Sequence, residues 1–223
     1  GQIVSTRTDV MPPDLVSELK KLQDDVAAIP STEVRAQIEG AFGKTVEEIY
    51  ERFDEKPIAA ASIGQVHRAV LKTAEGPKDV VVKVQRPGVA QTVARDLEIL
   101  DFMAGLLERA VPESKIYQPR KQVAEFARSI TAELDYTIEA DHARRFFKNF
   151  EGQPHIRFPR VYDEASARTV LTLEFLEGKK VYDAIAEGHS GEKIAKATTA
   201  IIVKQIFEDG FFHADPHPGN IFI

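Results

Sequence analysis

The first quarter of the chain places apolar residues at helical spacing. They recur at every third or fourth position, which predicts a helix over residues 12–28. The apolar face of that helix consists of Leu15, Leu19, Leu22 and Val26. The same pattern predicts shorter helices over 31–42 and 46–53. These three segments indicate a helical N-terminal extension, although a helical module that binds another protein is an alternative.

Beyond this extension the pattern changes to short strands. Residues 58–85 contain two stretches rich in β-branched side chains, separated by a turn over 73–78 that contains Gly and Pro. The segment Arg86-Pro87-Gly88 ends the second stretch. We therefore expect a strand, a turn and a second strand that carries a single lysine.

Two long helices are predicted next. Apolar residues keep helical spacing from 93 to about 112, and again from 119 to 150. Strands over 168–175 and a long helix over 192–208 complete the chain. The sequence contains no internal repeats.

Composition excludes several classes of protein. Hydrophobic residues make up 43% of 223 residues, which is enough for a substantial core. The net charge of −6 argues against broad nucleic-acid binding, because contacts to phosphate need a basic surface. The absence of cysteine excludes a disulfide scaffold and fits a reducing compartment. The composition fits a cytoplasmic protein, and we expect the full-length protein to associate with the membrane. The sequence contains no apolar run of 18 residues and no signal sequence.

The segment His213 to Asn220 carries the clearest chemistry. It reads H-x-D-x-x-x-x-N, the pattern of a kinase catalytic loop. In that pattern Asp215 would orient the phosphoryl acceptor and Asn220 would bind magnesium through its amide oxygen. The apolar residues before it, 206–212, predict that the loop follows a buried helix. The two histidines could instead be metal ligands, or the segment a polar turn. No D-F-G aspartate follows before the sequence ends.

A phosphate-binding lysine is expected upstream of such a loop. Lys83 lies inside the β-branched run 79–85, which resembles the V-A-I-K strand of protein kinases. By itself the run could equally be an edge strand with an outward lysine. Together with the catalytic loop it predicts a lysine that holds the α- and β-phosphates of a nucleotide.

The segment before this lysine departs from an ordinary protein kinase. A glycine-rich loop is expected there, but Gly64 is the sole glycine of residues 57–69. We predict that the segment covers the phosphates as a stiffer loop, because alanine resists positive φ. The expected nucleotide contacts are Ala59, Ala60, Ala61, Ser62, Ile63, Gly64 and Val66, with the Ser62 hydroxyl as a donor.

Four motifs in order give the chain a family resemblance. AAASIGQVHRA, VVVKVQRPGV, ELDYTIEA and FHADPHPGN resemble the UbiB family of atypical kinases, also called aarF-domain-containing kinases. The resemblance implies an α+β, protein-kinase-like, two-lobed fold whose alanine-rich loop replaces the glycine-rich one. It implies three segments: a helical extension over 1–57, a small lobe over 58–177, and the start of the large lobe over 178–223.

The family also assigns roles to particular residues. Its K-x-G-Q motif matches here only at its end, including Gln2, and that motif meets the carboxylates of E-x-D, here Glu133 and Asp135. Together they would form a lid over the site. Kinase spacing would pair Lys83 with Glu98, but the resemblance favours Glu139. On one continuous helix Asp135 and Glu139 would share a face.

The adenine-binding hinge is expected at Glu174, Phe175 and Leu176, which resemble the kinase hinge. The implied cofactors are ATP or ADP and Mg²⁺. The implied function is an atypical kinase or ATPase that supports ubiquinone or prenyl-lipid synthesis, with a quinone precursor, other biosynthetic proteins and the membrane surface as partners. Two alternatives stay open: a pseudokinase-like scaffold and a small-molecule phosphotransferase. We expect this segment alone to be inactive, because the D-F-G aspartate is not part of it.

Overall fold

The computed structural model describes residues 27–214 and 218–223, and their contacts define two compact units. The first unit extends to Lys148 and also includes Pro154–Phe175. The second consists of Asn149–Gln153 and Leu176–Ile223. The first helix expected from the sequence falls almost entirely outside the described residues. The division into three segments stays a prediction.

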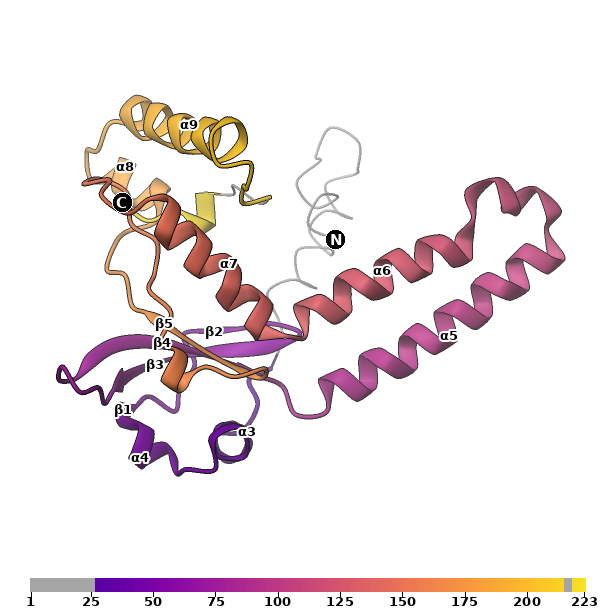
Figure 1. Ribbon diagram of the computed structural model, residues 1–223, viewed down its shortest axis with the longest axis horizontal. Helices are drawn as coiled ribbons and strands as arrows, with labels where there is room; N and C mark the ends of the chain where they lie inside the picture. Colours follow the sequence, from indigo (N-terminus) through magenta and orange to yellow (C-terminus); the bar gives the residue numbers. More distant parts are fainter. Residues whose placement is uncertain (1–26, 215–217) are drawn as a thin grey trace. The chain divides into compact units, whose positions relative to one another are not determined.

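A five-stranded antiparallel sheet forms the centre of the first unit (Figure 1). The strand order is β1-β3-β4-β5, with the short β2 also paired to β3. The strands are β1 (Tyr50–Phe53), β2 (Ala59–Ala60), β3 (Gly64–Leu71), β4 (Lys78–Gln85) and β5 (Val170–Glu174). Strands β3 and β4 form the expected hairpin, and Lys83 of β4 stands between Val66 of β3 and Leu171 of β5.

Helices cover both faces of this sheet (Figure 1). Val80, Val82 and Val84 point to one face and pack with α3 (Ser31–Phe42) and α4 (Val46–Ile49). Because side chains alternate along a strand, Lys83 points to the opposite face. There α7 (Tyr136–Asn149) packs on Leu171. One face therefore holds the main core, and the other holds the lysine.

The prediction of a helix over 46–53 is wrong in its second half. Helix α4 ends at Ile49, and the chain continues as strand β1. A capping box between Thr45 and Glu48 starts the helix. Tyr50 then pairs with Leu71, and its buried hydroxyl lies 3.1 Å from the Thr172 hydroxyl. These long-range contacts outweigh the local helical pattern.

The prediction of one helix over 119–150 is also wrong. Helix α6 (Pro119–Glu133) ends before α7 begins at Tyr136. At the break, Gln85 donates a 2.8 Å hydrogen bond to the Leu134 carbonyl, and the Tyr136 amide donates to the Arg168 carbonyl. The two helices therefore run in different directions (Figure 1). Asp135 precedes α7, so it does not share a helical face with Glu139.

A helical hairpin extends from the sheet in the first unit (Figure 1). It consists of α5 (Val89–Ala110), the 3₁₀ turn η1 (Pro112–Tyr117) and α6, which packs against α5. Arg120 of α6 forms a bidentate ion pair with Asp101 of α5. Many apolar side chains of the hairpin are exposed, among them Ile99, Phe102, Met103, Leu106 and Ile116. A further 3₁₀ turn, η2 (Asp163–Ala165), lies before β5.

The second unit contains α8 (Val181–Ala186), α9 (Gly191–Phe207) and the 3₁₀ turn η3 (Pro218–Asn220). Residues 180 and 222 form an isolated antiparallel bridge. The expectation of a buried helix before the catalytic loop is wrong, because Gln205 is the one buried residue of the described helix α9 and Phe207 is 81% exposed. No described helix is long and apolar enough to cross a membrane.

Candidate functional site

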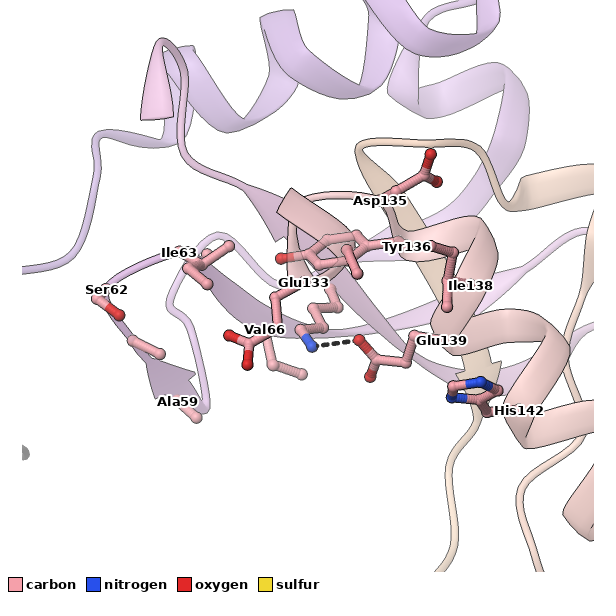
Figure 2. Close-up of a pocket in the computed structure, with 14 residues that line it drawn as sticks. Ala59, Ser62, Ile63, Val66, Glu133, Asp135, Tyr136, Ile138, Glu139 and His142 are labelled. Carbon is pink, nitrogen blue, oxygen red and sulfur yellow. Dashed lines mark hydrogen bonds and ion pairs between the residues drawn. The ribbon is translucent and has the colours of Figure 1, made fainter. Parts of the chain in front are cut away.

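The first unit contains a pocket of about 500 Å³ on the lysine-bearing face of the sheet (Figure 2). Its walls come from the alanine-rich segment, from β3 and β4, and from the junction of α6 and α7. The predicted site residues that line it are Ala59, Ala61, Ser62, Ile63, Gly64, Val66, Lys83, Glu133, Asp135 and Glu139. Ala60 does not line it. The fold thus brings together residues from three separate motifs.

An ion pair between strand and helix lies in this pocket. The Lys83 Nζ donates a hydrogen bond of 2.6 Å to Glu139 Oε2, drawn as the dashed line in Figure 2. The side chains are 34% and 45% exposed, so both remain accessible from the pocket. Glu98, the alternative partner, lies on α5 in the helical hairpin. Kinases orient their strand lysine with a helical glutamate in the same way.

Tyr136 lies next to this ion pair. The Lys83 Nζ is 4.7 Å from the centre of its ring, within the range of a cation–π contact. The tyrosine is 1% exposed, and its hydroxyl has no hydrogen-bond partner in the described structure. Burial, followed by the charge of Glu139, raises the pKa of Tyr136. The Lys83 ammonium therefore contacts both the Tyr136 ring and the Glu139 carboxylate.

Sequence reasoning missed Tyr136 and also His142, which lines the same pocket. The sequence does contain a pattern that could have identified both residues. The two residues lie three positions before and three positions after Glu139, which places all three on one side of a helix. If Glu139 is the partner of Lys83, this spacing predicts that Tyr136 and His142 also face the pocket.

The alanine-rich segment is held in a fixed turn. The Ala61 amide donates to the Gly64 carbonyl at 2.8 Å, and the Arg86 amide donates to the Ile63 carbonyl at 2.8 Å. Gly64 is required by close packing. A Cβ at this position would lie 2.5 Å from the Tyr136 hydroxyl oxygen and 2.6 Å from the Val84 carbonyl oxygen. The loop therefore approaches both the sheet and Tyr136 more closely than a side chain would allow.

The two acids of the E-x-D motif lie where α6 meets α7. Asp135 accepts hydrogen bonds from the Thr137 amide at 3.0 Å and hydroxyl at 2.5 Å, so it caps α7. The Thr137 hydroxyl bond, followed by the Thr137 amide bond and the charge of Arg168, lowers the pKa of Asp135. Glu133 is the last residue of α6. Gln2, the third member of the expected lid, lies outside the described residues.

The expected hinge residues form other contacts. Glu174 pairs with Arg157 at 2.5 Å, and the Arg68 guanidinium lies 4.1 Å from the centre of the Phe175 ring. The Phe175 amide donates to the Asp79 carbonyl. Leu176 begins the last segment of the second unit. None of Glu174, Phe175 and Leu176 lines the pocket described above.

The catalytic-loop motif lies in the second unit. Asp215 is outside the described residues, whereas Asn220 ends η3 and is exposed. The His213 amide donates a 2.9 Å hydrogen bond to Gln205 of α9, which anchors the start of the loop. Within residues 27–214 and 218–223, no three His, Cys, Asp or Glu side chains gather to form a metal site. Asn220 occupies the motif position at which a kinase catalytic loop carries an amide side chain.

The first unit combines an antiparallel sheet, a strand lysine paired with a helical glutamate, and a loop of small residues next to that lysine. This is the small-lobe arrangement of a kinase-like protein. The chain belongs to the ABC1 atypical kinase-like domain family, whose sequence model matches residues 21–223. This finding confirms the resemblance to UbiB-type kinases and the α+β, kinase-like fold class.

Curated relatives of this family include proteins described as probable protein kinase UbiB. The whole chain is 39% identical to the one from Aeromonas hydrophila, 40% identical to the one from Marinobacter nauticus and 41% identical to one from Pseudomonas fluorescens. It spans 41–42% of the length of these relatives. A similar solved structure is the complex of Rv3197 with erythromycin from Mycobacterium tuberculosis. It has a TM-score of 0.75 and 27% identity, and the match covers 100% of this chain and 56% of that one.

Proposed function

We propose that this chain is the nucleotide-binding part of an atypical kinase-like ATPase of the UbiB type. The observation that carries the proposal is the contact between Lys83 and Glu139 in a pocket that the alanine-rich loop lines. The pocket is also lined by the carboxylates of Glu133, Asp135 and Glu139, and the Lys83 ammonium beside them can neutralise part of the charge of a polyphosphate that carries Mg²⁺. The proposed role of the whole protein is to support ubiquinone or related prenyl-lipid synthesis.

The site residues predicted from the sequence have defined parts in this proposal, both those that line the pocket and those outside it. The Lys83 ammonium binds the α- and β-phosphates, and Glu139 keeps that ammonium oriented when the pocket is empty. The Ser62 hydroxyl and the backbone amides of the loop contact phosphate oxygens. The hinge at Glu174 to Leu176 binds adenine through backbone groups. Gln2, Glu133 and Asp135 limit the access of large substrates.

The second unit supplies the remaining groups. Asp215 accepts a proton from, or orients, the nucleophile that attacks the γ-phosphate, and Asn220 contributes an amide oxygen to the metal. Magnesium, when bound, neutralises the charge that develops on the phosphate oxygens. Water or a small acceptor suits the proposed lid better than a folded protein does. A quinone precursor, other biosynthetic proteins and the membrane surface are the proposed partners.

Nucleotide binding is the first test. In a thermal-shift titration, Mg–ATP or Mg–ADP at a hundred times its dissociation constant should stabilise the protein by about 2.7 kcal/mol. For a domain of this size the midpoint should rise by roughly 5–10 °C. Lys83→Met should abolish the rise, because it removes the phosphate-binding charge and leaves a similar apolar stem.

The matched control is Lys78→Met. Lys78 begins the same strand and makes only a 3.7 Å ion pair with Glu75 at the surface, so this variant should retain the full shift. Absence of any shift in the wild type, or an equal shift in Lys83→Met, would contradict the proposal.

A further inference from the structure

Arg86 connects two segments that are far apart in sequence. Its Nη2 donates a 2.7 Å hydrogen bond to the Ala27 carbonyl, and its Nε donates a 2.8 Å hydrogen bond to the Ala61 carbonyl. Its backbone amide also donates to the Ile63 carbonyl. Residue 27 belongs to the N-terminal part of the chain, whereas Ala61 and Ile63 form the turn over the pocket. One guanidinium thus joins that part to the loop.

A second connection reinforces the first. The Ile29 amide donates a 3.0 Å hydrogen bond to Gln65 Oε1, and Gln65 is 1% exposed. Gln65 directly follows Gly64, the last residue of the loop's turn. Residues 27–29 are therefore fixed at both ends, at Ala27 by Arg86 and at Ile29 by Gln65.

The orientation of the Gln65 amide follows from its neighbours. The buried His67 places Nδ1 at 2.8 Å from the Asp54 carbonyl, which can only accept a hydrogen bond, so Nδ1 carries the proton. Its Nε2 must then accept from Gln65 Nε2, 2.8 Å away. Burial lowers the pKa of His67 and so favours this neutral form. Gln65 Oε1 is thereby directed to the Ile29 amide.

We infer that Arg86 is a positioning residue that couples residues 27–29 to the alanine-rich loop. A guanidinium suits this role because its fixed fork can reach two carbonyl groups at once, which an ammonium on a flexible stem does less well. A displacement of residues 27–29 is transmitted through Arg86 to Ala61 and Ile63. The position of the loop over the pocket then depends on the N-terminal extension. The effect on nucleotide binding rests on the proposed function, but the link between the segments does not.

Amide hydrogen exchange tests the link in the nucleotide-free protein. In Arg86→Ala, exchange at the Ile29 and Ala61 amides should be about five to ten times faster than in the wild type, because both segments lose a charge-assisted hydrogen bond. Arg86→Lys should give an intermediate increase. The control is Arg95→Ala, an exposed arginine on α5 outside the pocket, which should leave both rates unchanged. Rates within twofold of the wild type at both amides in Arg86→Ala would overturn the inference.

The coupling itself is tested by adding Mg–ADP. Binding in the pocket should slow exchange at Ile29 in the wild type, because linkage between two sites is reciprocal. In Arg86→Ala, Mg–ADP should slow exchange at Ala61 but no longer at Ile29. Equal slowing at Ile29 in both proteins would overturn the coupling. If Mg–ADP fails to stabilise the wild type, the proposed function fails, and the nucleotide-free comparison still decides the role of Arg86.

Discussion

At the scale of single residues, Gly64 packs so closely against Tyr136 of the pocket and Val84 of the sheet that no side chain fits there. Alanine there would place its Cβ 2.6 Å from the backbone oxygen of Val84, which cannot move without disturbing β4. We expect Gly64→Ala to lower the free energy of unfolding by about 1–3 kcal/mol, the usual cost of overpacking. Urea denaturation measures this change.

The matched control for this change is Gly40→Ala. Gly40 lies inside α3 with nothing within 4 Å of the added Cβ. Alanine should stabilise the protein there by roughly 0.5–1 kcal/mol, because it restricts the unfolded chain and favours the helix. If both variants changed stability by the same amount and sign, the close packing around Gly64 would not matter.

The partner of Lys83 can also be tested one residue at a time. Glu139→Gln keeps the shape of the side chain but removes the charge that orients the lysine. We expect it to weaken Mg–ADP binding about tenfold, as measured by calorimetry. Glu98→Gln, on the helical hairpin, should bind Mg–ADP like the wild type. The opposite result, with loss of binding only in Glu98→Gln, would reassign the lysine partner to α5.

At the scale of elements, the break between α6 and α7 directs Glu139 to the sheet. Asp135 caps α7, so Asp135→Ala should lower the free energy of unfolding by about 1 kcal/mol at pH 7. The folded-state pKa of Asp135 is lowered, so its charge stabilises the fold above the unfolded pKa of about 3.9 and loses this effect as the pH falls through the folded pKa.

The pH dependence separates the charge of this cap from its hydrogen bonds. Asp135→Asn retains an acceptor for the Thr137 amide, so it should be close to the wild type at pH 7. As the pH falls and Asp135 becomes protonated, the free energy of unfolding of the wild type should decrease. Neither variant should show this part of the decrease, because neither carries the carboxylate. Thermal melts between pH 7 and 3 measure it. A stability difference between Asp135→Ala and the wild type that does not shrink at low pH would contradict a capping role for the carboxylate.

At the scale of the whole molecule, the sequence predicts the kinase-like class because its motifs are local. Lys83 lies in a β-branched run and Gly64 near a strand start, so short patterns suffice to find them. The errors occur where distant residues decide the structure. Tyr50 becomes a strand residue through Leu71 and Thr172, and the break after Glu133 is fixed by Gln85. None of these three partners lies within a local stretch of sequence around the residue that it affects.

The order of the strands has a consequence for how the chain reaches this fold. Strands β3 and β4 are joined by a short turn, so they can pair within microseconds of collapse. Val84 of β4 pairs with Val170 of β5, which lies beyond α5, α6 and α7 in the sequence. Closing so long a loop costs entropy, so this pairing belongs to a late step of folding. The helical hairpin folds on local contacts and shortens the path between the two strands. We therefore expect Lys83 to acquire its neighbour Leu171 late in folding.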